Sequence, residues 1–358
     1  MDFPARFAEK FLQATHELPI ARYLASLEAR NLIIGPAGLA NAVAARAGPL
    51  NALVRETPDD IPPDVDAVYV LQQTPAGEIA LKNRLSEGGG RRVYSICYDV
   101  APFLVSGRDP RVEAGPGKHA YALISNPRTG STFLCNLLEQ AGLGRPKEHL
   151  RDDGIGYLLR SGADPRLMAE RLMAADTHDG IFGTKFISHY LQTGLQDPPA
   201  MVAFLRWLQA EHGFIFFYLI RDTVEAVASY YVAKQTNIWA ATPTAPFREL
   251  QRRYASIPYD RERLAGLYAD FRRWDETMRA VLSAVPGAWP VFDYATLKAD
   301  PGRYIRHVAR TLAVDSAALA PSVDLAKSTA SLRAAFPRIG EITEQLRQDV
   351  ETDLISYR

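Results

Sequence analysis

The sequence predicts an α/β protein with parallel sheets, because short apolar runs of strand length alternate along the chain with helix-like segments. Three such runs, at 31–34, 66–71 and 92–97, are separated by segments with helical spacing. Two more, at 121–124 and 214–220, come later in the chain and are apolar throughout. A continuous apolar run is typical of a strand that is buried on both faces of a parallel sheet.

Two domains are expected from the length and from a break in composition. The chain has 358 residues, and residues 108–118 contain two prolines, two glycines and several charges, as a linker would. We therefore expect a small Rossmann-like βαβ module over 1–117 and a second α/β domain over 118–358. The first module carries the turn GPAG at 35–38, which lacks the full G-x-G-x-x-G pattern. This favours a structural or regulatory role for the module over a dinucleotide site.

Composition excludes some partners. Lysine plus arginine equals aspartate plus glutamate at 41 each, so no global field favours nucleic acid, and any anion site must be local. Cys97 and Cys135 lie in apolar segments, which predicts two buried free thiols and a reducing compartment. The N-terminus has no apolar signal segment, and the run 214–220 is too short to span a membrane. We expect a soluble, cytoplasmic protein.

The loop between residues 125 and 132 is the main candidate for an anion site. It follows the run 121–124 and precedes a segment with helical spacing, so backbone N–H groups and a helix dipole would face a ligand. A Walker A loop needs a lysine before its hydroxyl residue, whereas PRTGST at 127–132 has only Arg128. The run 214–220 ends in Arg221 rather than in a carboxylate that could hold Mg²⁺. The pattern therefore favours phosphate or sulfate held by arginine and backbone amides.

Arg221 is the second basic element of this hypothesis. A side chain at the carboxyl end of a strand stands where ligands bind in open α/β sheets. Asp222 would cap a helix over 223–234, and Ser229 lies about two helical turns further on. The alternative, a surface arginine paired with Asp222, is equally compatible with the sequence.

These segments carry a family resemblance. PRTGST at 127–132 and RDTVEAVASYY at 221–231 resemble the two cofactor signatures of sulfotransferases that use 3′-phosphoadenosine 5′-phosphosulfate, PAPS. Four further segments also look like that family: GRPKE at 144–148, FGTK at 182–185, QTNIW at 235–239 and DYATLKADP at 293–301. The resemblance covers about residues 119–310. It is strongest to the bacterial trehalose sulfotransferase (Stf0-like) group and the related lipopolysaccharide and Nod-factor sulfotransferases.

The resemblance implies a fold and a set of roles. The fold would be a P-loop-like, three-layer α/β/α arrangement around a parallel sheet. The 5′-phosphosulfate would lie against Arg128 and the loop that follows it, and the 3′-phosphate against Arg221 and Ser229. Thr129, Gly130, Ser131 and Thr132 would bind it through their backbone amides, and Ser131 and Thr132 also through their hydroxyls.

The resemblance also implies the chemical residues. Glu148 would be the general base, with His189 as the competing candidate. Lys185 would stabilise the leaving phosphate or only anchor its strand. His149 could orient Glu148, although a surface position is favoured, and Trp239 with Gln235 would line a pocket or pack in a core.

The expected reaction moves a sulfuryl group from PAPS to a hydroxyl of a carbohydrate, glycolipid or other small acceptor. It would release adenosine 3′,5′-bisphosphate, PAP, and need no metal. A non-catalytic nucleotide-binding scaffold is the alternative. A small-molecule kinase is disfavoured by the missing lysine and metal carboxylate. The resemblance leaves a homodimer open, and residues 151–180 and 237–260 show no readable acceptor specificity.

Overall fold

The computed structural model describes residues 3–59, 61–87, 90–109, 117–239, 252–314, 337–352 and 354–355. The chain forms two compact units. Unit 1 comprises Met1–Lys118, Glu148–Phe182 and Tyr190–Phe204, and unit 2 comprises His119–Lys147, Gly183–His189 and Leu205–Arg358. The expected domains, 1–117 and 118–358, stay a prediction. The predicted linker falls mostly on 110–116, outside the described residues.

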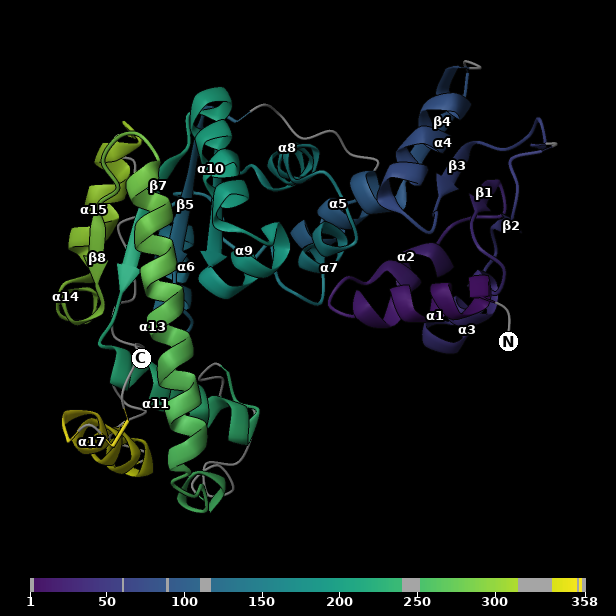
Figure 1. Ribbon diagram of the computed structural model, residues 1–358. Helices are drawn as coiled ribbons and strands as arrows, with labels where there is room; N and C mark the ends of the chain where they lie inside the picture. Colours follow the sequence, from purple (N-terminus) through teal and green to yellow (C-terminus); the bar gives the residue numbers. More distant parts are fainter. Residues whose placement is uncertain are drawn as a thin grey trace. The chain divides into compact units, whose positions relative to one another are not determined.

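Unit 1 contains a sheet of four parallel strands in the order β2-β1-β3-β4 (Figure 1). The strands are β1 (Asn31–Ile34), β2 (Leu53–Arg55), β3 (Ala67–Val70) and β4 (Arg92–Ser95). Its helices are α1 (Phe3–Ala14), α2 (Ile20–Ala25), α3 (Leu39–Ala47), α4 (Pro75–Glu87), α5 (Ala101–Ser106), α7 (Ile155–Arg160) and α8 (Pro165–Asp176). The three strands expected before residue 100 are present, and β2 is an additional short strand.

The third of these strands ends earlier than the apolar pattern predicts. β4 stops at Ser95, and Ile96–Val100 forms a π-helical turn, η1. The hydroxyl of Ser95 accepts a hydrogen bond from Tyr98 N at 3.0 Å, and the Asp99 carboxylate accepts one from Ser95 N at 2.7 Å. Serine and aspartate that bond to nearby backbone N–H groups compete with a strand ladder, which explains the early end.

A buried carboxylate lies beside this turn. Glu78, fully buried in the first turn of α4, accepts hydrogen bonds from the Ser95 hydroxyl, from Cys97 N at 2.6 Å and from Gln72 N at 3.3 Å. Burial raises the pKa of Glu78 and these donors lower it, and because burial is the larger effect the pKa is about 7. Burial, and then the field of Glu78, raises the pKa of Cys97.

Unit 1 should therefore be less stable in alkaline than in mildly acidic solution. Because the pKa of Glu78 is higher in the folded chain than in the unfolded chain, the folded chain binds the extra proton between about pH 4.5 and 7. We expect the free energy of unfolding of unit 1 to fall by roughly 2 kcal/mol from pH 5.5 to 8, and Glu78→Gln to flatten this slope.

Urea titrations can measure this effect unit by unit. The four tryptophans, Trp207, Trp239, Trp274 and Trp289, all belong to unit 2, so their fluorescence reports that unit and serves as an internal control. Circular dichroism adds the signal of unit 1. The same pH slope in the wild type and in Glu78→Gln would contradict the prediction.

Unit 2 contains a second four-stranded sheet in the order β6-β5-β7-β8. The strands are β5 (His119–Ser125), β6 (Ile181–Ile187), β7 (Ile215–Ile220) and β8 (Val291–Asp293). Its main helices are α6 (Ser131–Gln140), α11 (Thr223–Thr236), α13 (Arg261–Ala284), α14 (Tyr294–Ala299), α15 (Pro301–Thr311) and α17 (Pro337–Glu351). Helices α9 (Ser188–Leu195) and α10 (Pro198–His212) are divided, because Tyr190–Phe204 belongs to unit 1. The α/β class with parallel sheets that the sequence predicts is confirmed.

Two strands of this sheet end at once in a helix. β6 stops at Ile187, and helix α9 begins with Ser188. β8 covers only Val291–Asp293, and helix α14 begins with Tyr294. Asp293 ends β8 because its carboxylate caps α14, accepting from Ala295 N at 2.8 Å and from Thr296 N at 3.1 Å.

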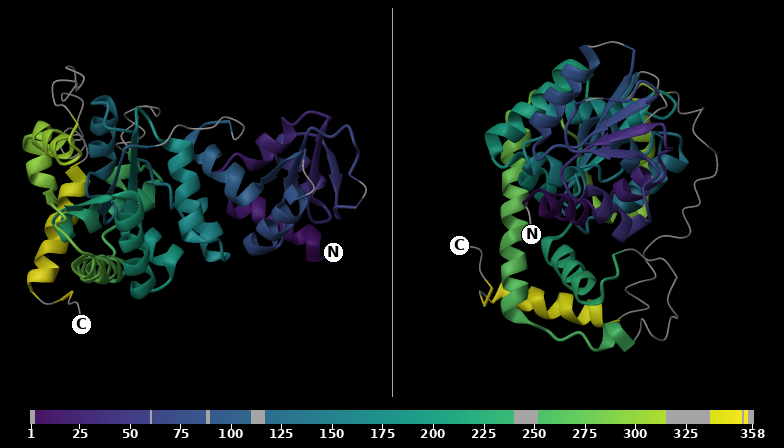
Figure 2. Two further views of the ribbon diagram at one scale, coloured as in Figure 1. Left: turned by 90° about the horizontal axis from the view of Figure 1, so that it is seen from above. Right: turned by 90° about the vertical axis from the view of Figure 1, so that its right-hand side faces the viewer.

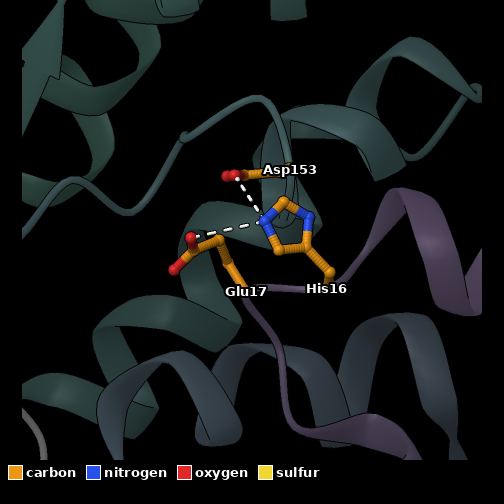
Figure 3. A group of neighbouring side chains, drawn as sticks. All are labelled: His16, Glu17 and Asp153. Carbon is orange, nitrogen blue, oxygen red and sulfur yellow. Dashed lines mark ion pairs between the residues drawn. The ribbon is translucent and has the colours of Figure 1, made fainter. Parts of the chain in front are cut away.

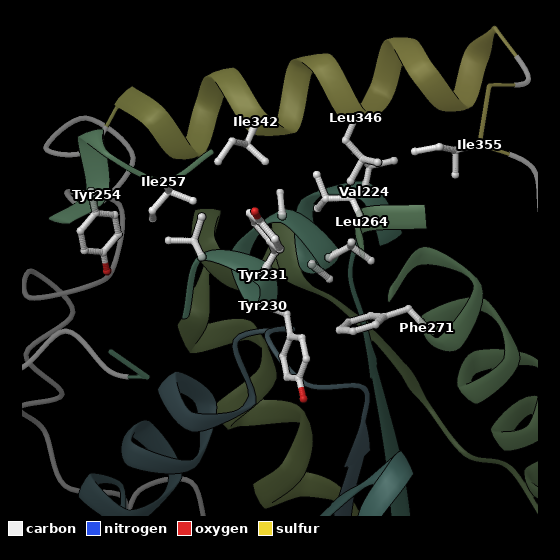
Figure 4. Packing of buried hydrophobic residues seen from close by; sticks show 14 residues of the cluster. Val224, Tyr230, Tyr231, Tyr254, Ile257, Leu264, Phe271, Ile342, Leu346 and Ile355 are labelled. Carbon is white, nitrogen blue, oxygen red and sulfur yellow. The ribbon is translucent and has the colours of Figure 1, made fainter. Parts of the chain in front are cut away.

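The C-terminal helix α17 packs on α11, the helix that follows Arg221. Figure 2 shows α17, in yellow, crossing the long helix α13. Figure 4 shows Ile342 and Leu346 of α17 pointing toward Val224 and Tyr231 of α11 in one apolar cluster. At the same surface Arg347 forms an ion pair at 3.2 Å with Asp222, the residue that caps α11. The position of α11 therefore depends on α17.

Removing the α17 contact should loosen α11. Leu346 is fully buried, so Leu346→Ala is expected to cost about 2–5 kcal/mol of unfolding free energy for unit 2, measured by tryptophan fluorescence in urea. Leu354 is 59% exposed, and Leu354→Ala is the matched control with an expected change near zero. Equal losses in the two variants would show that α17 is not packed as described.

Two composition-based expectations concern single features. Cys97 and Cys135 are buried free thiols, as predicted. Among the described residues, no helix is both long and apolar enough to cross a membrane.

Candidate active site

The sheet of unit 2 brings the loop after β5 beside Arg221. β5 and β7 are parallel neighbours, with Ser125 in register with Leu219, so both strands end at the same edge. β8 pairs with β7 on the other side, with Asp293 opposite Ile220. The residues that follow these three strands therefore meet at one carboxyl edge, where ligands bind in open parallel sheets.

The loop itself is shaped by two residues with positive φ. Arg128 has φ 64° and Gly130 has φ 86°, and Gly130 is the N-cap residue of α6. No side-chain hydrogen bond caps this helix. The hydroxyl of Thr129 donates instead to Asn126 O at 3.0 Å, which closes the turn before the helix. Backbone N–H groups at the start of α6 are thus left to a ligand.

Gly130 is required by its surroundings as well as by its backbone. A Cβ atom on this residue would lie 2.5 Å from the ring of Tyr294, the first residue of α14. The same ring holds Arg221, whose guanidinium lies 4.4 Å from the ring centroid. Tyr294 therefore closes one side of the loop and fixes Arg221 by a cation–π contact.

Arg128, Arg221 and Ser229 lie together. Arg128 Nε donates to the Ser229 hydroxyl at 3.1 Å, and a terminal nitrogen of Arg221 donates to Arg128 O at 2.9 Å. Burial lowers the pKa of Arg128, and the charge of Arg221 lowers it further. Two neighbouring, partly buried cations repel one another unless an anion lies between or beside them.

The pairing of Arg221 settles an alternative raised by the sequence. Its carboxylate partner is Glu225, at 3.0 Å, one turn along α11. Asp222 instead caps α11, its carboxylate accepting from Glu225 N at 2.9 Å. The expected cap is confirmed, whereas the alternative pair of Arg221 with Asp222 is not formed.

Lys185 is another cation at this edge. It lies on β6, is only 4% exposed, and its ammonium donates to the Thr132 hydroxyl at 3.0 Å. Ser131 and Thr132 form the first turn of α6. The predicted cradle residues of unit 2 thus belong to one cluster: Arg128, Thr129, Gly130, Ser131, Thr132, Lys185, Arg221 and Ser229.

The edge also holds polar groups that a ligand could engage. The hydroxyl of Ser125 is fully buried and has no hydrogen-bond partner among the described residues. Such an orphaned group needs an explanation, and an anionic ligand over the loop is one. Together with the uncapped helix start and the two arginines, it suits an anionic ligand.

Three further residues singled out in the sequence, His189, Trp239 and Gln235, belong to unit 2. His189, in the first turn of α9, stacks on Trp274 with 4.9 Å between ring centroids. Trp239 is 44% exposed, so the alternative that it packs in a core is wrong, and its carbonyl accepts from Arg128. Gln235 is exposed.

Glu148 belongs to unit 1. It is half-buried, and its carbonyl accepts from Arg151 N at 3.3 Å. The pKa of Tyr190 is raised to about 12, first by burial and second by the negative charge of Glu148. Tyr190 is a neighbour of Glu148 that the sequence analysis missed, since tyrosine at the end of an apolar segment carries no distinctive signal.

The favoured surface position of His149 was wrong. Its side chain is 1% exposed, and Nε2 lies 2.9 Å from the carboxylate of Asp176, which is fully buried. The His149 ring also stacks on Phe182. Asp176 lies 27 residues further along the chain, so no local pattern could have indicated the pair.

One cluster in unit 1 has the composition of a metal site. His16, Glu17 and Asp153 gather their ligand atoms within 4.8 Å of one another (Figure 3). However, Arg151 already pairs with Glu17 at 3.3 Å and with Asp153 at 3.2 Å. Because a guanidinium at the two carboxylates neutralises them and would repel a metal ion, the cluster is a surface ion-pair network.

Comparison with known proteins places this geometry in a family. The family model for Stf0 sulphotransferase matches residues 120–333, more than half of the chain. The chain belongs to the Stf0 sulfotransferase family. This match includes all ten predicted site residues and leaves out residues 1–119 and helix α17. Family membership supports sulfotransferase activity, and the expected resemblance is confirmed.

Solved structures of sulfotransferases are also similar to the chain. One is a sulfotransferase from Alicyclobacillus acidocaldarius, with 16% identity over 67% of this chain and 98% of that chain, and a TM-score of 0.37. Another is the sulfotransferase domain of the Synechococcus PCC 7002 olefin synthase, with 16% identity over 65% of this chain and 95% of that chain, and a TM-score of 0.31. Because both TM-scores are low, the assignment rests on the family model. No curated protein matches the chain significantly.

Proposed function

We propose that this sulfotransferase transfers a sulfuryl group from PAPS to a hydroxyl of a carbohydrate, glycolipid or other small acceptor. The observation that carries the proposal is the meeting of Arg128, Arg221 and Ser229 beside the uncapped start of α6. Two arginines and a helix N-terminus can neutralise phosphate groups at two separate points of one nucleotide.

In this proposal the loop and α6 hold the 5′-phosphosulfate. The backbone N–H groups of Thr129 to Thr132 and the hydroxyls of Ser131 and Thr132 would bind its oxygens. Arg221 and Ser229 would bind the 3′-phosphate. Arg128 donates to Ser229, so its guanidinium is close to both groups of contacts.

Sulfuryl transfer needs a base, an in-line acceptor and cations near the leaving phosphate. A bond forms between the acceptor oxygen and sulfur while the bond from sulfur to the 5′-phosphate oxygen breaks. We propose that Glu148 takes the proton of the acceptor hydroxyl. Lys185, held by Thr132 at 3.0 Å, would balance the charge that develops on the leaving phosphate, and PAP is released.

His189 is the second candidate for the base. Its ring is stacked on Trp274, a contact that fixes a ring but also suits a purely structural role. Glu148 is favoured because it holds the position that the resemblance of GRPKE at 144–148 implies for the base, and a half-buried carboxylate can accept a substrate proton.

PAPS-dependent labelling of an acceptor is the expected result. The protein is incubated with ³⁵S-labelled PAPS and a panel of sugars, glycolipids and small alcohols, with and without EDTA. We expect label on an acceptor in both conditions. Binding of PAP without transfer to any acceptor would instead favour a nucleotide-binding scaffold, and Mg²⁺-dependent turnover of ATP would favour a kinase.

The same assay identifies the base. Glu148→Gln keeps the size of the side chain and removes its basicity, so turnover should fall by at least about 100-fold while the Kd for PAP stays unchanged. His189→Ala is the comparison variant. Loss of turnover in His189→Ala with normal turnover in Glu148→Gln would assign the base to the histidine.

A further inference from the structure

A chain of hydrogen-bonded polar groups, buried at Asp176 and His149, runs through unit 1 and ends at His149, the residue that follows Glu148. The Asp176 carboxylate lies 2.9 Å from His149 Nε2 through one oxygen and 2.9 Å from His178 Nε2 through the other. On its far side, Nδ1 of His178 lies 3.3 Å from a terminal nitrogen of Arg108. Arg108 also donates to Thr177 O at 2.9 Å.

The polarity of this chain is fixed by its members. The guanidinium of Arg108 can only donate, so Nδ1 of His178 accepts and its Nε2 carries the proton. That Nε2–H then donates to Asp176, whose second oxygen accepts the Nε2–H of His149. In this arrangement each oxygen of Asp176 accepts one hydrogen bond.

Burial shows that Asp176 and His149 do not touch a substrate. Asp176 and the side chain of His149 are fully buried, and His149 is further held by its stacking on Phe182, with 5.4 Å between ring centroids. A buried histidine locked on two sides fixes its own backbone. Because Glu148 is the preceding residue, its Cα position is fixed with it.

This series of hydrogen bonds also links residues 1–118 to the segment that carries Glu148. Arg108 follows α5, whereas Asp176 and His178 end the segment of α8, and α5 packs on α8. A second contact supports the same packing, since Asp164 N donates to the Tyr98 hydroxyl at 2.8 Å. Residues 1–118, which the family match leaves out, thus supply Arg108, the outer end of this series of hydrogen bonds.

We propose that Asp176 is a positioning residue for Glu148, and that the N-terminal part of the chain supplies Arg108 to hold it. Asp176 orients His149, which fixes the backbone at Glu148, and Arg108 orients the His178 ring on the other carboxylate oxygen. The inference rests on the proposed role of Glu148 as the base, and it gives residues 1–118 a role in sulfuryl transfer.

Asp176→Asn tests the proposal at nearly constant size. An amide cannot accept from two imidazole N–H groups through both of its terminal atoms, so one histidine loses its partner. We expect backbone amides in residues 148–156 to exchange with deuterium about tenfold faster or more. We also expect kcat with the best sugar of the panel above to fall about 10- to 100-fold, with an unchanged Kd for PAP.

Arg171→Ala is the matched control. Arg171, on α8, contacts Asp99 at 3.5 Å and so joins the same two parts of unit 1 without touching His149. It should leave exchange in 148–156 and kcat unchanged, whereas Arg108→Met should reproduce the effects of Asp176→Asn in weaker form. Normal exchange and normal kcat in Asp176→Asn would overturn the proposal, as would equal effects in Arg171→Ala.

The test separates this inference from the proposed function. Hydrogen exchange reports positioning even if no acceptor is found. If Glu148→Gln abolishes turnover and Asp176→Asn changes neither exchange nor kcat, the positioning role is wrong while the base assignment holds. If Asp176→Asn speeds exchange but Glu148→Gln keeps full turnover, the base assignment is wrong.

Discussion

Gly130→Ala should abolish measurable binding of PAP. The residue has φ +86°, and a Cβ would lie 2.5 Å from the ring of Tyr294. The left-handed backbone alone costs a non-glycine residue about 1–2 kcal/mol, and the steric overlap adds about 1–3 kcal/mol. Either the loop or Tyr294 must move, and both hold the groups that face the ligand.

Gly142→Ala is the control for this variant. Gly142 has φ +76°, and nothing lies within 4 Å of the place that its Cβ would take, so the variant carries the backbone cost without the overlap. Its expected loss is about 1–2 kcal/mol of stability with normal PAP binding. The double variant Gly130→Ala with Tyr294→Ala should recover stability relative to Gly130→Ala. Calorimetric titration with PAP and urea unfolding measure both effects, and normal PAP binding by Gly130→Ala would contradict the described loop.

Arg221→Ala should weaken PAP binding by about 10- to 150-fold. A charge-assisted hydrogen bond contributes about 1.5–3 kcal/mol, and tenfold in affinity corresponds to about 1.4 kcal/mol. The substitution also frees the carbonyl of Arg128 from its 2.9 Å contact and removes a partner of Glu225. Arg221→Lys should be intermediate, because it keeps the charge but loses the fork that spans Arg128 and Glu225.

Arg273→Ala controls for the loss of an arginine from the same unit. Its side chain is 64% exposed on α13 and pairs with Asp270 three residues before it. We expect an unchanged Kd for PAP in this variant. Similar losses in Arg221→Ala and Arg273→Ala would mean that general charge, rather than the site, controls binding.

Sequence patterns were sufficient for the parts of the site that are local. The loop at 127–132 follows a strand and opens a helix, and Arg221 ends a strand, so each could be read from its own neighbourhood. The loop and Arg221 meet because β5 pairs in parallel with β7. The apolar runs predict a parallel sheet, but the register of this pair is known only from the structure.

Long-range contacts were beyond the sequence. Tyr294 closes the loop across 164 positions from Gly130, and the apolar contact of α17 on α11 joins segments more than a hundred residues apart. Asp176 has no motif, because a buried carboxylate between two histidines depends on tertiary packing. The early end of β4 was missed because local hydrogen bonds of Ser95 and Asp99 outweigh an apolar run.

The N-terminal part of the chain and α17 extend the family pattern in different ways. Residues 1–118 pack with the segment that holds Glu148 in unit 1, whereas α17 packs on α11 in unit 2. Each addition thus packs on a segment next to proposed functional residues. Leu346→Ala should therefore act on PAP binding, and Asp176→Asn on turnover.

The proposed function depends above all on one ligand being held at two separate phosphates. Titration of the protein with PAP and with adenosine 5′-monophosphate, which lacks the 3′-phosphate, is the direct test. We expect PAP to bind at least about 10-fold more tightly, and Arg221→Ala to remove most of this difference. Equal affinities for the two nucleotides in the wild type, or a preference for PAP that survives in Arg221→Ala, would contradict the two-phosphate site.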